Sequence, residues 1–354
     1  MARLLCYIVL AAAALSAPAE ELQLLEGEPG AGAALEVGLL LFDDGVESDT
    51  EDNRREGIFP EIRAAEAAYF PYALRRTLVD SNHWGAVRVM PGASSSSELL
   101  ITGTIVHSDG ETLELQLVAR DARGIVWFDQ LFSGTAAEDA YQPHQRRQRR
   151  PFQHLYNEVA NALLQHREGL EEKSLREIRQ VAGLRYAGDL APSAFDRYLA
   201  RDIDGIYRVQ GLPSMEDPMV QRIQRVREQE YLFIDTTDEE YAALYTEMTP
   251  VYDLWRQFQR EQFQYRDAYE ERLADRDKPR KGSYQALKQT YYNYRWEKIQ
   301  RQEMKLLAKG FNNEVAPTSV EVEGRVFKLA GSLEERYREW RSILGRIYDL
   351  ETGF

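Results

Sequence analysis

The sequence has only one cysteine, Cys6, and this residue lies inside an apolar segment near the N-terminus. Residues 1–19 combine a short positive start, an apolar run and the small residues Ala17 and Ala19, which is the pattern of a cleavable secretory signal peptide. We therefore expect the mature chain to begin at Glu20. Such a chain has no disulfide, no thiol nucleophile and no thiolate metal site.

The sequence also lacks a second long apolar run and an excess of basic residues. No other segment approaches the ~20 apolar residues that a membrane-spanning helix requires, so we expect no transmembrane segment in the mature chain. The net charge of −14 disfavours binding to nucleic acid. Together with the signal-peptide pattern, these features predict a periplasmic protein.

Sequence motifs for catalysis or cofactor binding are missing as well. The chain has no phosphate-binding loop and no dinucleotide fingerprint, and its five histidines are not spaced as metal ligands. Ser94–Ser97 lack the G-x-S-x-G context of a nucleophile elbow. The sequence therefore predicts no catalytic residue, no metal site and no cofactor. A hydrolase that acts on the cell wall with a pair of carboxylates is the alternative, because 58 acidic residues leave many candidate pairs.

The first half of the chain predicts an α+β domain over residues 35–168, after a flexible lead-in at residues 20–34. Apolar and turn-forming residues predict strands at 37–42, 84–90, 99–107, 113–120 and 125–132, and helices at 60–80 and 151–164. The order is β-α-β-β-β-β-α, and short turns join the last three strands into an antiparallel meander. Trp127 lies between apolar neighbours in the last strand, so we expect it to anchor the core.

Residues 169–354 predict a mostly α-helical module with a long helical hairpin. Thr237 and Glu240 match a capping box, which predicts that the first arm starts there and runs to about Ala274. The second arm is predicted at residues 284–309. An alternating segment at 320–329 predicts a small β-hairpin that turns at Glu323-Gly324, and a final helix follows it.

Aromatic residues gather between residues 241 and 300, where they make up 13 of 60 positions against 11% in the whole chain. Arginine and glutamine alternate with them, and Trp, Tyr and Arg dominate the hot spots of protein interfaces. The same rings could instead hold a helical bundle together. Tyr291, Tyr292 and Tyr294 cannot all face one core, so at least one is predicted to be exposed. The candidate partner-binding rings are Trp255, Tyr291, Tyr292, Tyr294 and Trp296.

A second candidate for partner binding is the basic segment at residues 145–150, an expected loop tip. It contains Arg146, Arg147, Arg149 and Arg150 in a chain that is otherwise acidic. Such a cluster can attract an acidic partner or a lipid headgroup.

Short motifs in the first half occur in an order found in a known domain type. They are Leu39-Leu40-Leu41-Phe42, Val87-Arg88-Val89, Gly103-Thr104-Ile105, Asp121-Ala122-Arg123-Gly124 and Val126-Trp127. With them, residues 37–164 resemble the small α/β domain of the periplasmic Tol-system translocation protein and of the lipoproteins that activate penicillin-binding proteins. The resemblance implies a non-catalytic binding or adaptor domain. The expected partner is an envelope protein or peptidoglycan-associated machinery, such as a peptidoglycan synthase or an outer-membrane assembly.

Overall fold

The computed structural model describes residues 22–30, 33–46, 58–136, 140–141, 150–214, 216–274, 318–322, 325–329 and 333–352. Its centre is a five-stranded sheet with the order β2-β1-β3-β4-β5. The strands are β1 (Val37–Leu40), β2 (Val87–Met90), β3 (Leu99–Ser108), β4 (Thr112–Asp121) and β5 (Val126–Thr135). All five coincide with segments predicted as strands.

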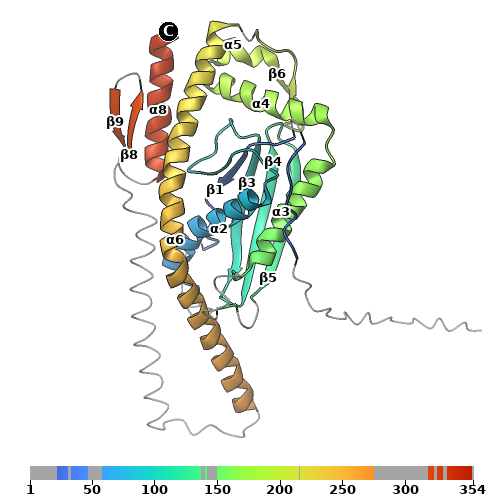
Figure 1. Ribbon diagram of the computed structural model, residues 1–354, viewed down its shortest axis with the longest axis vertical. Helices are drawn as coiled ribbons and strands as arrows, with labels where there is room; N and C mark the ends of the chain where they lie inside the picture. The colour runs from blue at the N-terminus through green and yellow to red at the C-terminus, as the bar shows by residue number, and fades with distance from the viewer. Residues whose placement is uncertain are drawn as a thin grey trace, which may run out of the picture.

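The sheet is mixed, since β1 runs parallel to both β2 and β3, whereas β3, β4 and β5 form the expected antiparallel meander. In β4, every second side chain is buried, as the alternating sequence requires for a strand with one covered face. Two helices cover that face, α2 (Pro60–Ser81) and α3 (Gln153–Glu168). The protein therefore has the predicted α+β fold, a small sheet with two helices followed by helical elements (Figure 1).

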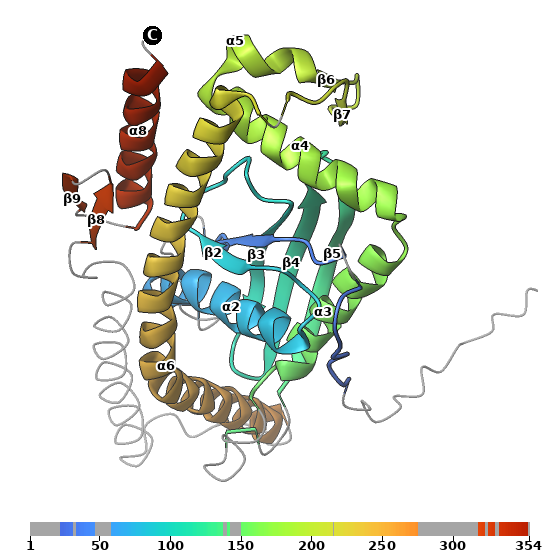
Figure 2. The same cartoon turned by 45° about the horizontal axis from the view of Figure 1, so that its top comes forward.

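A second group of elements follows α3 and lies across one end of the sheet (Figure 2). It consists of α4 (Glu172–Leu190), the short helix α5 (Pro192–Phe195), one 3₁₀ turn, η1 (Asp196–Tyr198), and the two-stranded sheet of β6 (Leu199–Arg201) and β7 (Tyr207–Val209). Apolar residues of α4, including Ile178 and Val181, join the same hydrophobic core as the five-stranded sheet.

The longest element is α6 (Pro218–Ala274), a helix of 57 residues that runs along the whole molecule (Figure 1). At 1.5 Å per residue it is about 85 Å long. The capping box predicted at Thr237 is wrong, because the helix begins 19 residues earlier and Thr237 lies inside it. The hydroxyl of Thr237 donates to the carbonyl of Ile234 within the helix, so this polar side chain is satisfied without capping an end.

The chain ends with β8 (Thr318–Val322), β9 (Arg325–Leu329) and α8 (Leu333–Thr352). The two strands pair antiparallel, which confirms the predicted strands of the small hairpin. Helix α8 lies beside α6 (Figures 1 and 2), and Phe233 of α6 stacks on both Tyr337 and Trp340. The predicted second arm, residues 284–309, lies outside the described residues.

One hydrophobic core joins the two halves that the sequence separates at residue 168. Four buried residues of α6, Tyr245, Met248, Tyr252 and Trp255, belong to the same apolar cluster as the sheet and α2. A second cluster joins α4, α6 and α8 and includes Met90 of the sheet. Because α6 contributes to both clusters, it fixes the helical elements to the sheet.

Candidate functional site

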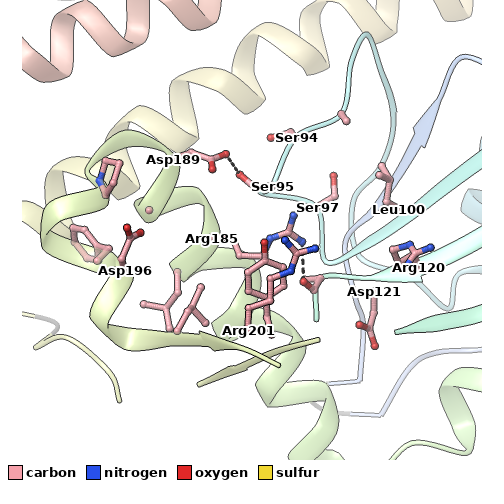
Figure 3. A pocket seen from close by; sticks show the side chains of 18 of the residues that line it. Ser94, Ser95, Ser97, Leu100, Arg120, Asp121, Arg185, Asp189, Asp196 and Arg201 are labelled. Atoms are coloured by element: carbon pink, nitrogen blue, oxygen red, sulfur yellow. Dashed lines mark hydrogen bonds between the residues drawn. The ribbon is translucent and has the colours of Figure 1, made fainter. Parts of the chain in front are cut away.

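A concave cleft of about 790 Å³ lies where α4, α5, β6 and β7 meet the sheet (Figure 3). One wall is the loop after β2, with Ser94, Ser95 and Ser97. The end of β4 and the turn that follows it form a second wall, and the helical elements form the third. The site is thus built from several separate segments of the chain, which extend from Ala93 to Arg341.

Three arginines line the end of the cleft that faces the sheet. Arg185 comes from α4 and Arg201 from β6, and both guanidinium groups stack on the ring of Tyr207, at 4.7 and 5.3 Å from its centroid. Figure 3 shows these two side chains next to each other, with Arg120 at the end of β4 beyond them. Stacking on one aromatic ring holds two like charges together.

Each of these arginines donates a hydrogen bond to a backbone carbonyl. Arg120 donates to Gly124 at 2.9 Å, Arg185 donates to Ala122 at 2.8 Å, and Arg201 donates to Gly205 at 3.2 Å. Within the described part of the chain, no carboxylate lies within salt-bridge distance of any of the three. The guanidinium groups are therefore held in place while their charge is not neutralised.

The turn that supplies two of those carbonyls is organised by Asp121. Its carboxylate accepts hydrogen bonds from the backbone N–H groups of Arg123 and Ile125, from the Arg123 guanidinium and from Nε1 of Trp127. Gly124 has a φ of +96°, a value that favours glycine. The backbone N–H of Tyr207 donates to the Arg123 carbonyl at 2.7 Å, which joins the turn to β7. This wall of the cleft is therefore rigid.

The serine wall is tied to α4, α6 and α8. Ser95 donates to Asp189 of α4 at 2.6 Å, and Ser94 donates to the buried Glu230 of α6 at 3.0 Å. Glu230 also accepts a 2.7 Å hydrogen bond from the hydroxyl of Tyr337 in α8. Burial and the charge of Glu230 raise the pKa of Tyr337, so this hydroxyl remains a donor. The loop is thereby held from three helices.

The cleft lacks the usual arrangement for acid–base or nucleophilic catalysis. Among the described residues that line it there is no histidine, lysine or cysteine. Asp121 is saturated by the hydrogen bonds of its own turn, and Asp189 faces Ser95 and, at 3.8 Å, Arg341. In the described ranges, no three acidic, histidine or cysteine side chains are grouped as metal ligands. The arrangement is suited to holding a ligand.

No family model, curated protein or solved structure matches this chain. The resemblance of residues 37–164 to the Tol-system and activator domains consequently stays a prediction that rests on the short motifs. The candidate site is interpreted from its own geometry.

The two described residues that were predicted to bind a partner, Trp255 and Arg150, do not line the cleft. Trp255 is 1% exposed and packs edge-on against Phe59 at 5.7 Å, so the structure places it in the core instead of on a surface. It shares one buried helix face with Tyr252 and Met248, at the spacing of three and four residues that faces a helix toward its core. Its assignment to a partner surface is therefore corrected.

Arg150 is partly buried and donates to the hydroxyl of Tyr245 at 2.8 Å, so it is engaged within the protein. The other predicted residues lie outside the described ones. They are Arg146, Arg147, Arg149, Tyr291, Tyr292, Tyr294 and Trp296. Their assignment to a partner surface stays a prediction.

The cleft residues were not identified from the sequence. In the sequence, Ser94–Ser97 show only that they lack the context of a nucleophile elbow. Arg120, Arg185 and Arg201 stand in three separate segments with no shared motif. One relevant signal was present, because Asp121-Ala122-Arg123-Gly124 was recognised as a tight turn. That motif locates the turn that forms one wall of the cleft. The residues that contact this turn from elsewhere in the chain, Arg185 and Tyr207, are brought there by the fold.

Proposed function

We propose that this protein is a non-catalytic binding protein, an adaptor of the cell envelope that holds a ligand in the cleft between the sheet and α4. The observation that carries the proposal is the set of three anchored arginines, Arg120, Arg185 and Arg201, which have no carboxylate partner among the described residues. A guanidinium stays charged at all physiological pH values and cannot transfer a proton, but it is well suited to recognition. The cleft therefore has binding groups in place and no acid–base pair.

The alternative of a carboxylate-dependent hydrolase has less support in the cleft. That chemistry needs two carboxyl groups on opposite sides of the scissile bond, one of them free to donate a proton. Asp189 and Asp196 both come from the α4–α5 side of the cleft, as Figure 3 shows. The carboxylate of Asp121 accepts hydrogen bonds from Arg123 and Trp127, so it is already engaged within the protein. These positions favour binding over hydrolysis.

The envelope location of the adaptor rests on the signal-peptide pattern of residues 1–19 and on the resemblance of residues 37–164. Among the helices that the structure describes, none is long and apolar enough to cross a membrane. The partner in this proposal is an envelope protein or the peptidoglycan-associated machinery. The rings at Tyr291, Tyr292, Tyr294 and Trp296 are proposed as its docking surface.

A cleft-blocking variant tests the binding function. Ala200 of β6 lines the cleft, so Ala200→Trp fills it, whereas Ser193→Trp places the same ring on an exposed position of α5 outside the lining. We would incubate each protein with a soluble extract of envelope small molecules and identify what remains bound by native mass spectrometry. The expected result is a molecule that the wild type and Ser193→Trp retain and that Ala200→Trp does not.

The state of the recovered molecule distinguishes binding from catalysis. An adaptor returns it unchanged after prolonged incubation, and it releases no soluble fragments from purified peptidoglycan. Time-dependent conversion of the ligand, or fragment release that Asp196→Asn abolishes, would show an enzyme. Equal retention by Ala200→Trp and Ser193→Trp would show that the cleft is not the binding site.

A further inference from the structure

Arg341, which also lines the cleft, lies 3.8 Å from both Asp189 and Glu230. Arg120, Arg185 and Arg201 differ from it and from other arginines of the protein because no carboxylate among the described residues lies within salt-bridge distance of them. Arg88 lies 2.6 Å from Asp235, Arg75 lies 2.6 Å from Asp238, and Arg123 lies 2.7 Å from Asp121. Arg120, Arg185 and Arg201 donate only to backbone carbonyls, although the chain has 58 acidic residues. Three cations that line one cleft, with no carboxylate partner in the part of the chain that the structure describes, offer a place for an external anion.

We propose that the arginine end of the cleft binds a doubly charged oxyanion group, a phosphate monoester or a pair of carboxylates, carried by a ligand whose remainder is uncharged. This inference rests on the proposed binding function and specifies what the same cleft binds. Arginine presents its N–H donors in a planar fork that matches carboxylate and phosphate oxygens, and such charge-assisted bonds are about twice as strong as neutral ones. Each of the three side chains uses one donor on a carbonyl and keeps the others.

Electrostatics explains why a double charge fits better than a single one. Arg185 and Arg201 stack on the same ring of Tyr207, so their charges repel each other when the cleft is empty. The turn around Asp121 fixes the carbonyls of Ala122 and Gly124, and therefore keeps Arg185 and Arg120 in place. An anion between preorganised guanidinium groups removes the repulsion without a rearrangement of the protein.

The opposite end of the cleft limits the charge that the rest of the ligand can carry. Asp189 and Asp196 lie on the α4–α5 side, away from Arg120, Arg185 and Arg201 (Figure 3), although Asp189 lies 3.8 Å from Arg341. Leu184, Phe195 and Leu199 add apolar lining. A ligand that was anionic along its whole length would be repelled by the two carboxylates. The volume of about 790 Å³ also exceeds what an isolated ion needs, so the oxyanion is one group of a larger molecule.

Titration of the full chain with two small anions tests this ligand class. Inorganic phosphate and citrate would be added separately, at low ionic strength, and binding followed by calorimetry. The variants are Arg185→Gln with Arg201→Gln, and Arg120→Gln alone. The matched control is Arg208→Gln, because Arg208 lies in β7 of the same small sheet, is 65% exposed and faces Asp202 outside the cleft lining.

The expected result is saturable binding of at least one anion, weakened at least tenfold by the double variant and unchanged by Arg208→Gln. Added salt should weaken it further, because partly exposed charges are screened. Preference for phosphate or for citrate distinguishes the two sources of the oxyanion. Absence of binding to the wild type, or equal loss in Arg208→Gln, would overturn the ligand class. If Ala200→Trp still abolished retention of an uncharged molecule, the binding function would stand without this ligand class.

Discussion

Two groups of arginines in this protein have opposite surroundings. Arg256 of α6 is 1% exposed and forms an ion pair with Glu66 of α2, which is equally buried. Three of the four arginines that line the cleft, Arg120, Arg185 and Arg201, are at least partly exposed and have no described carboxylate beside them. The comparison indicates that the role of each arginine depends on whether a carboxylate lies beside its guanidinium group. Where a carboxylate is present the side chain joins two helices, and where it is absent the side chain is available to a ligand.

The buried group is a continuous network between α6, α2 and β3. Arg256 also donates to Ser108, to the hydroxyl of Tyr252 and to Gln259, and Tyr252 donates to Glu66 at 2.7 Å. Burial lowers the pKa of Arg256 well below its ordinary value. A charge that is so costly to bury is tolerated only with this number of partners.

The largest expected effect is on this network. Arg256→Ala removes the closer cation of Glu66 and leaves this buried carboxylate only Arg63, at 3.9 Å, so it should lower the free energy of unfolding by about 3–5 kcal/mol. The matched control is Arg76→Ala, because Arg76 forms an exposed i,i+4 pair with Asp80 and should change stability by less than about 0.5 kcal/mol. Urea unfolding measures both values. Equal effects of the two variants would contradict the comparison.

Removing the carboxylate together with both of its cations tests the same point. In the triple variant Glu66→Leu, Arg63→Met and Arg256→Met, Glu66 and the two arginines that pair with it are all replaced, so much of the stability lost in Arg256→Ala should return. A triple variant as unstable as the single one would show that the hydrogen bonds of Tyr252 and Ser108 matter more than the ion pairs.

The next effect concerns the wall of the cleft. Trp127 is 7% exposed, stacks on His166 at 4.7 Å and donates to Asp121. Trp127→Ala should cost about 3 kcal/mol of unfolding free energy through the cavity and the lost bond. Trp127→Phe should recover part of this. An unchanged melting temperature would show that the ring does not support the turn.

A smaller effect, and one that depends on pH, is expected at Asp238. Its burial raises its pKa to about 6 despite the attraction of Arg75. Between about pH 4 and 6 the folded state therefore binds more protons than the unfolded state, and stability falls as pH rises through this range. Asp238→Asn removes that contribution, which is at most about 3 kcal/mol.

The measurement for Asp238 is the urea midpoint at pH 4, 5, 6 and 7, in the wild type and in Asp238→Asn. The stability difference between them should change steadily up to about pH 6 and then level off. Parallel curves would show that Asp238 does not titrate in this window.

The smallest effect on stability is expected at the cleft. Arg185→Gln with Arg201→Gln removes two stacking contacts on Tyr207 and one repulsion, so the net change should be within about 0.5 kcal/mol. Urea unfolding without added anion checks this. A loss as large as that of Arg256→Ala would place these arginines among the structural ones.

The sequence predicted the sheet well because its signals are local. Alternation in residues 113–120 and the turn at Asp121–Gly124 identify β4 and its connection to β5. The prediction of a helix start at Thr237 was wrong, because a threonine followed three positions later by Glu240 has the capping-box pattern although it lies inside α6. The sequence could not locate the cleft, because nothing in the local sequence of Arg185 or Arg201 indicates that Tyr207 will lie between them.

The position of Glu230 also has a consequence for the order of synthesis. Ser94 is made early, its partner Glu230 in α6 comes 136 residues later, and Tyr337, which binds the same carboxylate, comes another 107 residues after Glu230. Contacts this distant in sequence form late in folding. While the chain is still growing, the serine wall lacks its support from α8. A chain interrupted before Tyr337 would carry the arginines of the cleft opposite a wall that Asp189 and Glu230 hold but Tyr337 does not, so full support of the site depends on α8.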